Sequence, residues 1–222
     1  MDPVAVAVLE LGDVSYRYPG ATGPAIEGID LAIAEGEIVG VVGPNDAGKS
    51  TLCLVASGLA PASTGGDLTG GVELAVEAGI VFQDPATQRS GVTGTVFEEV
   101  AVGPVNLGRS VSETIAAVRA ALLTVGIEDL AERHPAHLSG GQAQLLSIAS
   151  AVAMGPGLLV LDEPTAQLDP EATDTVVAAL RSLAASGTAL LIAEHRLDVL
   201  DALGARLVAL DGGRVTPTGG PA

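Results

Sequence analysis

The 222-residue sequence is poor in basic and aromatic side chains. Lysine and arginine number 10 against 27 acidic residues, so the formal net charge is −17. Aromatic residues make up only 2% of the chain, with no tryptophan. Because a net negative charge repels polyanions, we expect no nonspecific attraction to DNA, RNA or anionic lipid. The composition therefore argues against a nucleic-acid partner.

Cysteine and long apolar runs are also lacking. Cys53 is the single cysteine, which excludes an internal disulfide, and we interpret it as a small buried hydrophobic residue. No run approaches 18 uninterrupted apolar residues, and the N-terminus lacks the basic region and apolar stretch of a signal peptide. With 48% hydrophobic residues the chain can bury a full core. We expect a cytoplasmic location, compatible with docking on a membrane partner.

The order of apolar segments predicts an α/β fold. Strands are expected at 4–10, 26–33, 37–42, 79–82, 158–161, 189–193 and 207–210. Helices are expected at 112–125, 139–154 and 171–185, and residues 216–222 are expected to form a frayed tail. Apolar strands that alternate with helices indicate a parallel sheet covered on both faces. We predict one domain over 1–222, with a helical subdomain inserted at about 87–155.

Lys49, the only lysine, ends a glycine-rich segment between a predicted strand and a predicted helix. The segment reads Gly43-Pro44-Asn45-Asp46-Ala47-Gly48-Lys49-Ser50, which fits the G-x-x-x-x-G-K-[ST] pattern of a phosphate-binding loop. Glycines let backbone N–H groups turn toward phosphate oxygens, and the following helix directs its N-terminal dipole at the anion. We expect Lys49 to reach the β- and γ-phosphates, Ser50 to ligate Mg²⁺ and Thr51 to contact the α-phosphate.

A second chemical element is the apolar segment 158–161, which is followed by Asp162 and Glu163. Neighbouring residues of a strand point to opposite sides, so the two carboxylates are expected to have different tasks. Asp162 is predicted to hold Mg²⁺. Glu163 is predicted to polarise the water that attacks the γ-phosphate. A strand that ends in two acids is weak evidence of function by itself. Together with the phosphate loop, the pair favours nucleotide hydrolysis.

A third element is the segment Leu138-Ser139-Gly140-Gly141-Gln142, which predicts a second anion receptor at a helix N-terminus. This segment resembles the signature motif of the ATP-binding-cassette (ABC) ATPases, and with the other motifs the resemblance covers essentially the whole chain. It implies a P-loop NTPase with a RecA-like parallel sheet core, an N-terminal antiparallel β-subdomain and an inserted helical subdomain. It also implies Mg²⁺-dependent ATP hydrolysis by two cassettes arranged head to tail, with ATP between one loop and the other signature.

The same resemblance assigns roles to four further positions. Tyr18 resembles the aromatic residue that stacks on adenine, and Tyr16 is the competing candidate. Gln83 matches the glutamine that senses Mg²⁺ or the attacking water. Asp169 matches the acidic loop residue at the dimer interface. His195, near a strand end, matches the histidine that contacts the γ-phosphate, where imidazole can stabilise transferred charge.

Finer similarity points to one branch of the family. The segments concerned are Val81-Phe82-Gln83-Asp84-Pro85-Ala86-Thr87-Gln88, Phe97-Glu98-Glu99-Val100-Ala101-Val102-Gly103-Pro104 and Ala193-Glu194-His195-Arg196-Leu197-Asp198. They look like ATPase subunits of energy-coupling-factor importers, including the cobalt and nickel branch. That resemblance implies uptake of a vitamin or transition-metal ion, with peripheral attachment at the cytoplasmic face of the membrane. It implies three partners: an identical or paralogous ATPase subunit, an integral-membrane coupling subunit and a membrane component that selects the substrate.

Two departures from the family pattern leave alternatives open. Asp46 stands where the family loop usually has glycine, and a carboxylate there would repel phosphate. Ala143 and Leu145 replace basic residues that commonly follow the signature. A soluble ABC ATPase not linked to transport and a noncatalytic ATP-binding subunit are therefore the alternatives. Because Lys49, Glu163 and His195 are all present, we expect an active enzyme.

Overall fold

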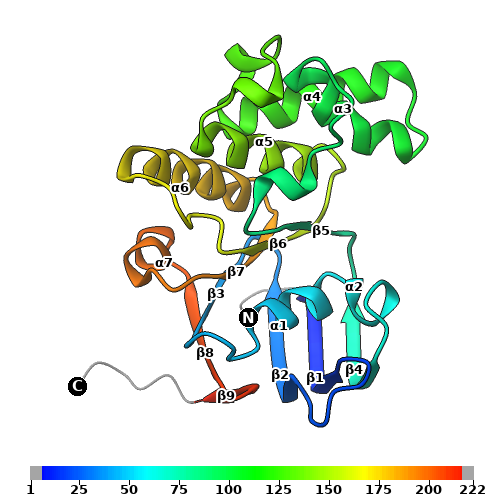
Figure 1. Cartoon of the computed structure of the whole chain (residues 1–222), viewed down its shortest axis with the longest axis vertical. Coiled ribbons are helices and arrows are strands. Elements are labelled where there is room, and N and C mark those ends of the chain that lie inside the picture. The colour runs from blue at the N-terminus through cyan, green and yellow to red at the C-terminus, as the bar shows by residue number, and fades with distance from the viewer. Residues whose placement is uncertain (1–6, 217–222) are drawn as a thin grey trace, which may run out of the picture.

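The computed structural model describes residues 7–216, which form two β-sheets and a layer of helices (Figure 1). The smaller sheet is antiparallel, in the order β2-β1-β4. Its strands are β1 (Ala7–Arg17), β2 (Ile26–Ala34) and β4 (Asp67–Leu74). Alternating buried and exposed residues along β1 and β2 are typical of a sheet with one covered face.

The larger sheet has six strands in the order β5-β6-β7-β3-β8-β9. They are β5 (Ala78–Val81), β6 (Leu158–Asp162), β7 (Ala189–Ala193), β3 (Ile38–Val42), β8 (Arg206–Asp211) and β9 (Arg214–Thr216). The first five are parallel, and β9 runs antiparallel to β8. The predicted parallel sheet is confirmed, and β7 spans the predicted residues 189–193.

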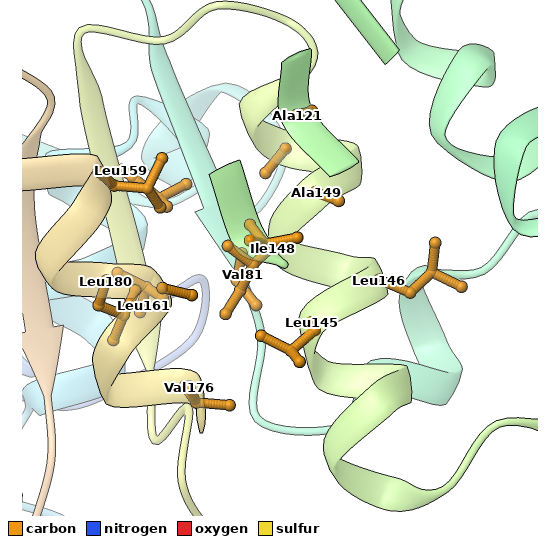
Figure 2. Close-up of a cluster of buried hydrophobic side chains, with 14 of the residues drawn as sticks. Val81, Ala121, Leu145, Leu146, Ile148, Ala149, Leu159, Leu161, Val176 and Leu180 are labelled. Carbon is orange, nitrogen blue, oxygen red and sulfur yellow. The ribbon is translucent and has the colours of Figure 1, made fainter. Parts of the chain in front are cut away.

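Both faces of this sheet are covered, which explains the continuous apolar runs of its strands. On β6, Leu159 and Leu161 belong to a core cluster with α5 (Gly140–Val152) and α6 (Pro170–Ala185). Figure 2 shows these two leucines beside α6. The alternate residues of β6 pack in a second cluster with α1 (Lys49–Ala56) and the antiparallel sheet.

Three helices follow β5 and form the outermost layer in Figure 1. They are α3 (Val96–Asn106), α4 (Val111–Val125) and α5, and each begins with a capping box in which a Ser or Thr side chain and the third helical residue satisfy each other's backbone N–H groups. The helix predicted from residue 112 in fact begins at Val111, because Ser110 pairs with Glu113 in such a box. The subdomain boundary at 87–155 stays a prediction.

Several elements were not predicted. The missed elements are β4, α2 (Leu59–Ala62), α7 (Leu197–Leu203), β9 and the short 3₁₀ helices η1 (Pro85–Gln88), η2 (Glu128–Leu130) and η3 (Pro135–His137). The strand expected at 4–10 lies partly outside the described residues, as does the tail from 217 onward, and β1 continues to Arg17. Cys53 is buried as predicted, and burial raises the pKa of its thiol. Within residues 7–216, no helix has the length and apolar character needed to span a membrane.

The loop between η1 and α3 is held by one buried carboxylate, Glu99 of α3. Glu99 accepts a hydrogen bond from the Ser90 hydroxyl at 2.7 Å, and others from the Ser90 N–H and the Thr93 hydroxyl. Burial alone would raise the pKa of Glu99, but these hydrogen bonds outweigh it and hold the pKa below its usual range. A lowered carboxyl pKa means that folding stabilises the ionised form.

Replacement Glu99→Gln should lower the free energy of unfolding at pH 7 by about 1–2 kcal/mol, because charge-assisted hydrogen bonds become neutral ones. The stability that Glu99 contributes is present above the unfolded pKa and is lost as pH falls through the folded pKa. The difference in unfolding free energy between the wild type and Glu99→Gln should therefore shrink in acid. Urea unfolding of both proteins at pH 7 and at a pH below the folded pKa of Glu99 would measure it. Glu132→Gln, at an exposed position, is the control; a Glu99→Gln deficit that is independent of pH would contradict the assignment.

Candidate active site

The order of the parallel strands brings the predicted site residues to one edge of the sheet. Gln83 follows β5, Glu163 follows β6, His195 follows β7 and the phosphate loop follows β3. Because these four strands are neighbours in the order β5-β6-β7-β3, their carboxyl ends meet. Ligands of open α/β sheets bind at such an edge.

The Glu163 carboxylate lies between two of these side chains. Gln83 Nε2 donates to Glu163 Oε2 at 2.8 Å, and His195 Nε2 lies 2.9 Å from Glu163 Oε1. The strand ends at Asp162, and Glu163 has a left-handed backbone with φ of 50°. We predicted that strand alternation points Asp162 and Glu163 to opposite sides. The reason is wrong, because Glu163 lies outside the strand and the turn that follows β6 directs its side chain away from Asp162. A strained backbone of this kind in a non-glycine residue is typical of functional sites.

The phosphate loop holds Lys49 in a buried position. The Lys49 ammonium donates to the carbonyl oxygens of Gly43 and Pro44, both at 2.9 Å, and the residue is only 6% exposed. A Cβ on Gly43 would come within 2.1 Å of the Leu210 carbonyl oxygen, so only glycine fits there. The two carbonyls can be exchanged for phosphate oxygens, which are stronger acceptors for a cation.

Two cavities involve predicted site residues: one of about 360 Å³ lies beside the signature segment, and the larger one, of about 760 Å³, lies against the phosphate loop. Its lining joins the phosphate loop to the carboxylate edge and to the turn before β9. The residues are Pro24, Ala25, Asn45, Asp46, Gly48, Lys49, Ser50, Thr51, Glu163, Gly212 and Gly213. The larger cavity therefore places the start of α1 and Glu163 on one wall.

Asp162 and Ser50 fit a magnesium site. The Ser50 hydroxyl donates to Asp162, while Asp162 Oδ1 is buried and has no hydrogen-bond partner within residues 7–216. Burial, together with the neighbouring Glu163 carboxylate, raises the pKa of Asp162. A cation bound there would offset the cost of keeping the Asp162 carboxylate ionised. Mg²⁺ prefers one or two protein oxygens combined with substrate phosphates. The described residues hold no cluster of three or more His, Cys, Asp or Glu side chains that suits a metal.

The structure separates the two tyrosine candidates. Tyr16 is fully buried in β1, and its hydroxyl donates to the Gly65 carbonyl at 2.6 Å, so it is a core residue. Tyr18 is partly exposed, and its hydroxyl lies 3.2 Å from the hydroxyl of Thr51. The two rings meet edge to face at 4.9 Å. Tyr18 is therefore the aromatic side chain next to the phosphate loop.

The signature segment lies at a different cavity. Ser139 caps α5 and accepts from the Gln142 N–H at 3.3 Å, so its own hydroxyl proton stays available to an anion. A Cβ on Gly141 would meet that of Ala172 at 2.6 Å, which explains glycine at this contact with α6. Ser139, Gly141 and Gln142 line the 360 Å³ cavity together with Asp169, the N-cap of α6. Predicted residues thus line two separate cavities, one at the phosphate loop and one at the signature segment, while Gln83, Asp162 and His195 line neither.

One of the two residues that replace the expected basic pair near the signature, Leu145, has a structural reason. Leu145 of α5 is almost fully buried in the core cluster that Figure 2 shows. A basic side chain at this position would leave a charge in an apolar core. Ala143 is partly exposed. The departure at Leu145 is therefore compatible with an intact signature segment.

One buried polar contact beside the site was missed. Glu194, directly before His195, is 1% exposed and accepts a 2.7 Å hydrogen bond from the Thr165 hydroxyl. In the sequence this acid resembles a solvated strand end. Only the apolar run of β7 before it gives a signal that it is buried.

Comparison with known sequences identifies relatives. A family model described as ABC transporter matches residues 26–166. The energy-coupling factor transporter ATP-binding protein EcfA of Methanothermobacter thermautotrophicus is 38% identical over 224 residues, covering 96% of this chain and 71% of the relative. A protein of the same description from Methanocaldococcus jannaschii is 36% identical, with 96% and 79% covered.

Solved structures of ABC transporter subunits and cassettes resemble this structure. The structure of cbiO1 from Clostridium perfringens, described as part of the ABC transporter complex cbiONQ, matches with a TM-score of 0.83 at 30% identity, covering 95% of this chain and 87% of that one. A dimeric ATP-binding cassette, MJ0796, in a post-hydrolysis state with ADP and Pi, matches with a TM-score of 0.77 at 25% identity, covering 93% and 96%.

The relatives and the solved structures match 93–96% of the chain, and the family model spans both the phosphate loop and the signature segment. They confirm the predicted fold class and the predicted ATPase activity. The chain belongs to the ATP-binding-cassette family of ATPases.

Proposed function

We propose that this chain is the ATP-hydrolysing subunit of an energy-coupling-factor importer that takes up a vitamin or a transition-metal ion. The observation that carries the catalytic part is the Glu163 carboxylate, held between Gln83 and His195 beside the phosphate loop. The relatives named EcfA and the structural match to cbiO1 support the importer part. The subunit would attach peripherally at the cytoplasmic face of the membrane.

The side chains have distinct tasks in this proposal. Lys49 exchanges its two carbonyl partners for the β- and γ-phosphate oxygens, and the N–H groups at the start of α1 complete the phosphate cradle. Ser50 and Asp162 would hold Mg²⁺, which would supply positive charge against the phosphate groups during transfer. Thr51 contacts the α-phosphate, and Tyr18 stacks on adenine.

Glu163 acts as the base that orients and polarises water. Each carboxylate oxygen has two lone pairs, so Glu163 can keep its contacts with Gln83 and His195 while it accepts from water. In this proposal His195 also contacts the γ-phosphate and stabilises transferred charge. Gln83 links this water site to the loop that precedes the helical layer.

The second cavity supports a dimer of cassettes. Ser139, Gly140, Gly141 and Gln142 would bind the ATP held by the partner's phosphate loop, with Asp169 at the interface. The partner is an identical or a paralogous cassette, and the pair docks on an integral-membrane coupling subunit and a substrate-binding membrane component. Such an arrangement gives each ATP two walls, one from each chain.

Replacement Glu163→Gln should lower ATP turnover of the assembled complex about 10²–10⁴-fold, because the base is lost while the shape is kept. ATP affinity should change little, since the phosphate contacts come from the loop. Turnover and equilibrium ATP binding would be measured on the same preparation, with Glu132→Gln as the surface control. Unchanged turnover would support the noncatalytic alternative instead.

Asp46 lines the nucleotide cavity and has a left-handed backbone with φ of 62°. Asparagine adopts this conformation readily, so Asp46→Asn removes charge without new strain. ATP should bind about three- to tenfold more tightly to this variant, since about 1 kcal/mol of repulsion is removed. Calorimetric titration of the variant and of Asp46→Gly would test this. Equal or weaker binding by both variants would show that the carboxylate does not face phosphate.

Purification from native membranes should recover the chain with an integral-membrane coupling subunit and a second membrane protein that binds the substrate. Mass spectrometry identifies these partners, and the ATP turnover of the isolated complex confirms that it is assembled. The chain would be purified through an affinity tag, and the control is the same purification from cells in which the chain carries no tag. Recovery of an active chain with no membrane protein would favour the soluble alternative.

A further inference from the structure

Glu194 is a buried acid that has no task in the proposed reaction. Both of its carboxyl oxygens are used: Oε2 accepts from the Thr165 hydroxyl at 2.7 Å, and Oε1 accepts from the backbone N–H groups of His195 at 3.0 Å and Arg196 at 3.2 Å. Burial of a carboxyl group is costly unless it is hydrogen-bonded, so this satisfied arrangement is a defined contact.

The contact with Thr165 joins two loops that are distant in sequence. Thr165 is 1% exposed and lies between Glu163 and Asp169, in the loop from β6 to α6. Glu194 lies at the end of β7, directly before His195. One hydrogen bond thus connects the loop that begins with the catalytic carboxylate to the loop that carries its histidine partner.

A second contact fixes the same two segments. Arg196 Nη1 donates to the hydroxyl of Thr173, a buried residue of α6, at 3.1 Å. The Arg196 guanidinium also pairs with Asp198 at 2.9 Å. The loop after β7 is therefore attached at both ends of the segment 165–173, and His195 lies between its two attachment residues.

A role limited to the local turn explains only part of this geometry. The N–H groups of His195 and Arg196 would be satisfied by any acceptor at position 194, as at a helix start. They do not require the hydrogen bond between Oε2 and Thr165, which lies 29 positions earlier in the sequence. The pairing of β6 with β7 brings the two loops together, and the Thr165 bond adds a side-chain connection just beyond the strand ends, where His195 and Glu163 meet at 2.9 Å.

We propose that Glu194 is a positioning residue that, through Thr165, sets His195 against Glu163. Glu194 itself contacts neither ATP nor the attacking water. This inference rests on the proposed function, because it assigns Glu194 an effect that passes through His195. Loss of the Thr165 bond should misplace the imidazole while leaving the phosphate loop intact.

The test is ATP turnover and ATP binding by the assembled complex. Thr165→Val keeps the side-chain shape and removes the hydroxyl, so the turnover number should fall about tenfold with ATP affinity within about twofold. Thr165→Ser keeps the hydroxyl and should retain turnover. Glu194→Gln should also retain it, because the amide oxygen accepts from the two N–H groups and the amide nitrogen donates to Thr165.

A double-mutant cycle distinguishes positioning from general damage. In a His195→Ala background, Thr165→Val should cause no further loss, since the group that it positions is gone. Multiplied losses in the double variant, or wild-type turnover by Thr165→Val, would overturn the inference while leaving the role of His195 intact. Wild-type turnover by His195→Ala would refute that role and the inference together. Thermal unfolding monitors folding, and Thr165→Ala replaces Thr165→Val if the latter does not fold.

Discussion

The site depends on the order β5-β6-β7-β3 of the parallel strands. Gln83 and Glu163 are 80 residues apart in sequence, yet they come within 2.8 Å because their strands are paired. Neighbouring strands lie about 4.7–4.9 Å apart, so side chains just beyond their ends reach each other directly. With β6 between β5 and β7, Glu163 is flanked by the residues that follow the outer two strands. The apolar core on both faces thus holds a polar edge that has little packing of its own.

Part of the folding free energy is given up at this edge. Four non-glycine residues of the described chain have positive φ, and three of them lie at the phosphate loop or just after β6: Asp46, Glu163 and Gln167. Left-handed backbone costs about 1–2 kcal/mol per such residue. It persists because the surroundings hold it, as when the Glu163 N–H donates to Ala193 of β7 at 2.8 Å. Strain at Glu163 turns the carboxylate toward Gln83 and His195, out of line with β6.

Local patterns predicted the elements whose signals lie in a few adjacent residues. The phosphate loop and the strands buried on both faces are of this kind. Strand β4 was missed because Gly70 and Gly71 resemble a loop, and pairing with β1 makes it a strand. Tyr16 and Tyr18 are two positions apart, so strand periodicity does not separate them; contact between Tyr16 and Gly65 does. Glu194 was missed for the same reason, since its partner Thr165 is distant in sequence.

The charge of the chain has a consequence for how two cassettes would close on ATP. This chain carries a net charge of −17 and Lys49 is its only lysine, so a second copy of the chain and a bound ATP would each add further negative charge. Long-range electrostatics therefore oppose closure. In the proposed dimer, the free energy of closure would come from short-range contacts to the nucleotide, made by Lys49 and by the N–H groups of two helix N-termini. Hydrolysis would remove the contacts to the γ-phosphate, while Lys49 would keep its contact with the β-phosphate, so the same repulsion would then favour reopening.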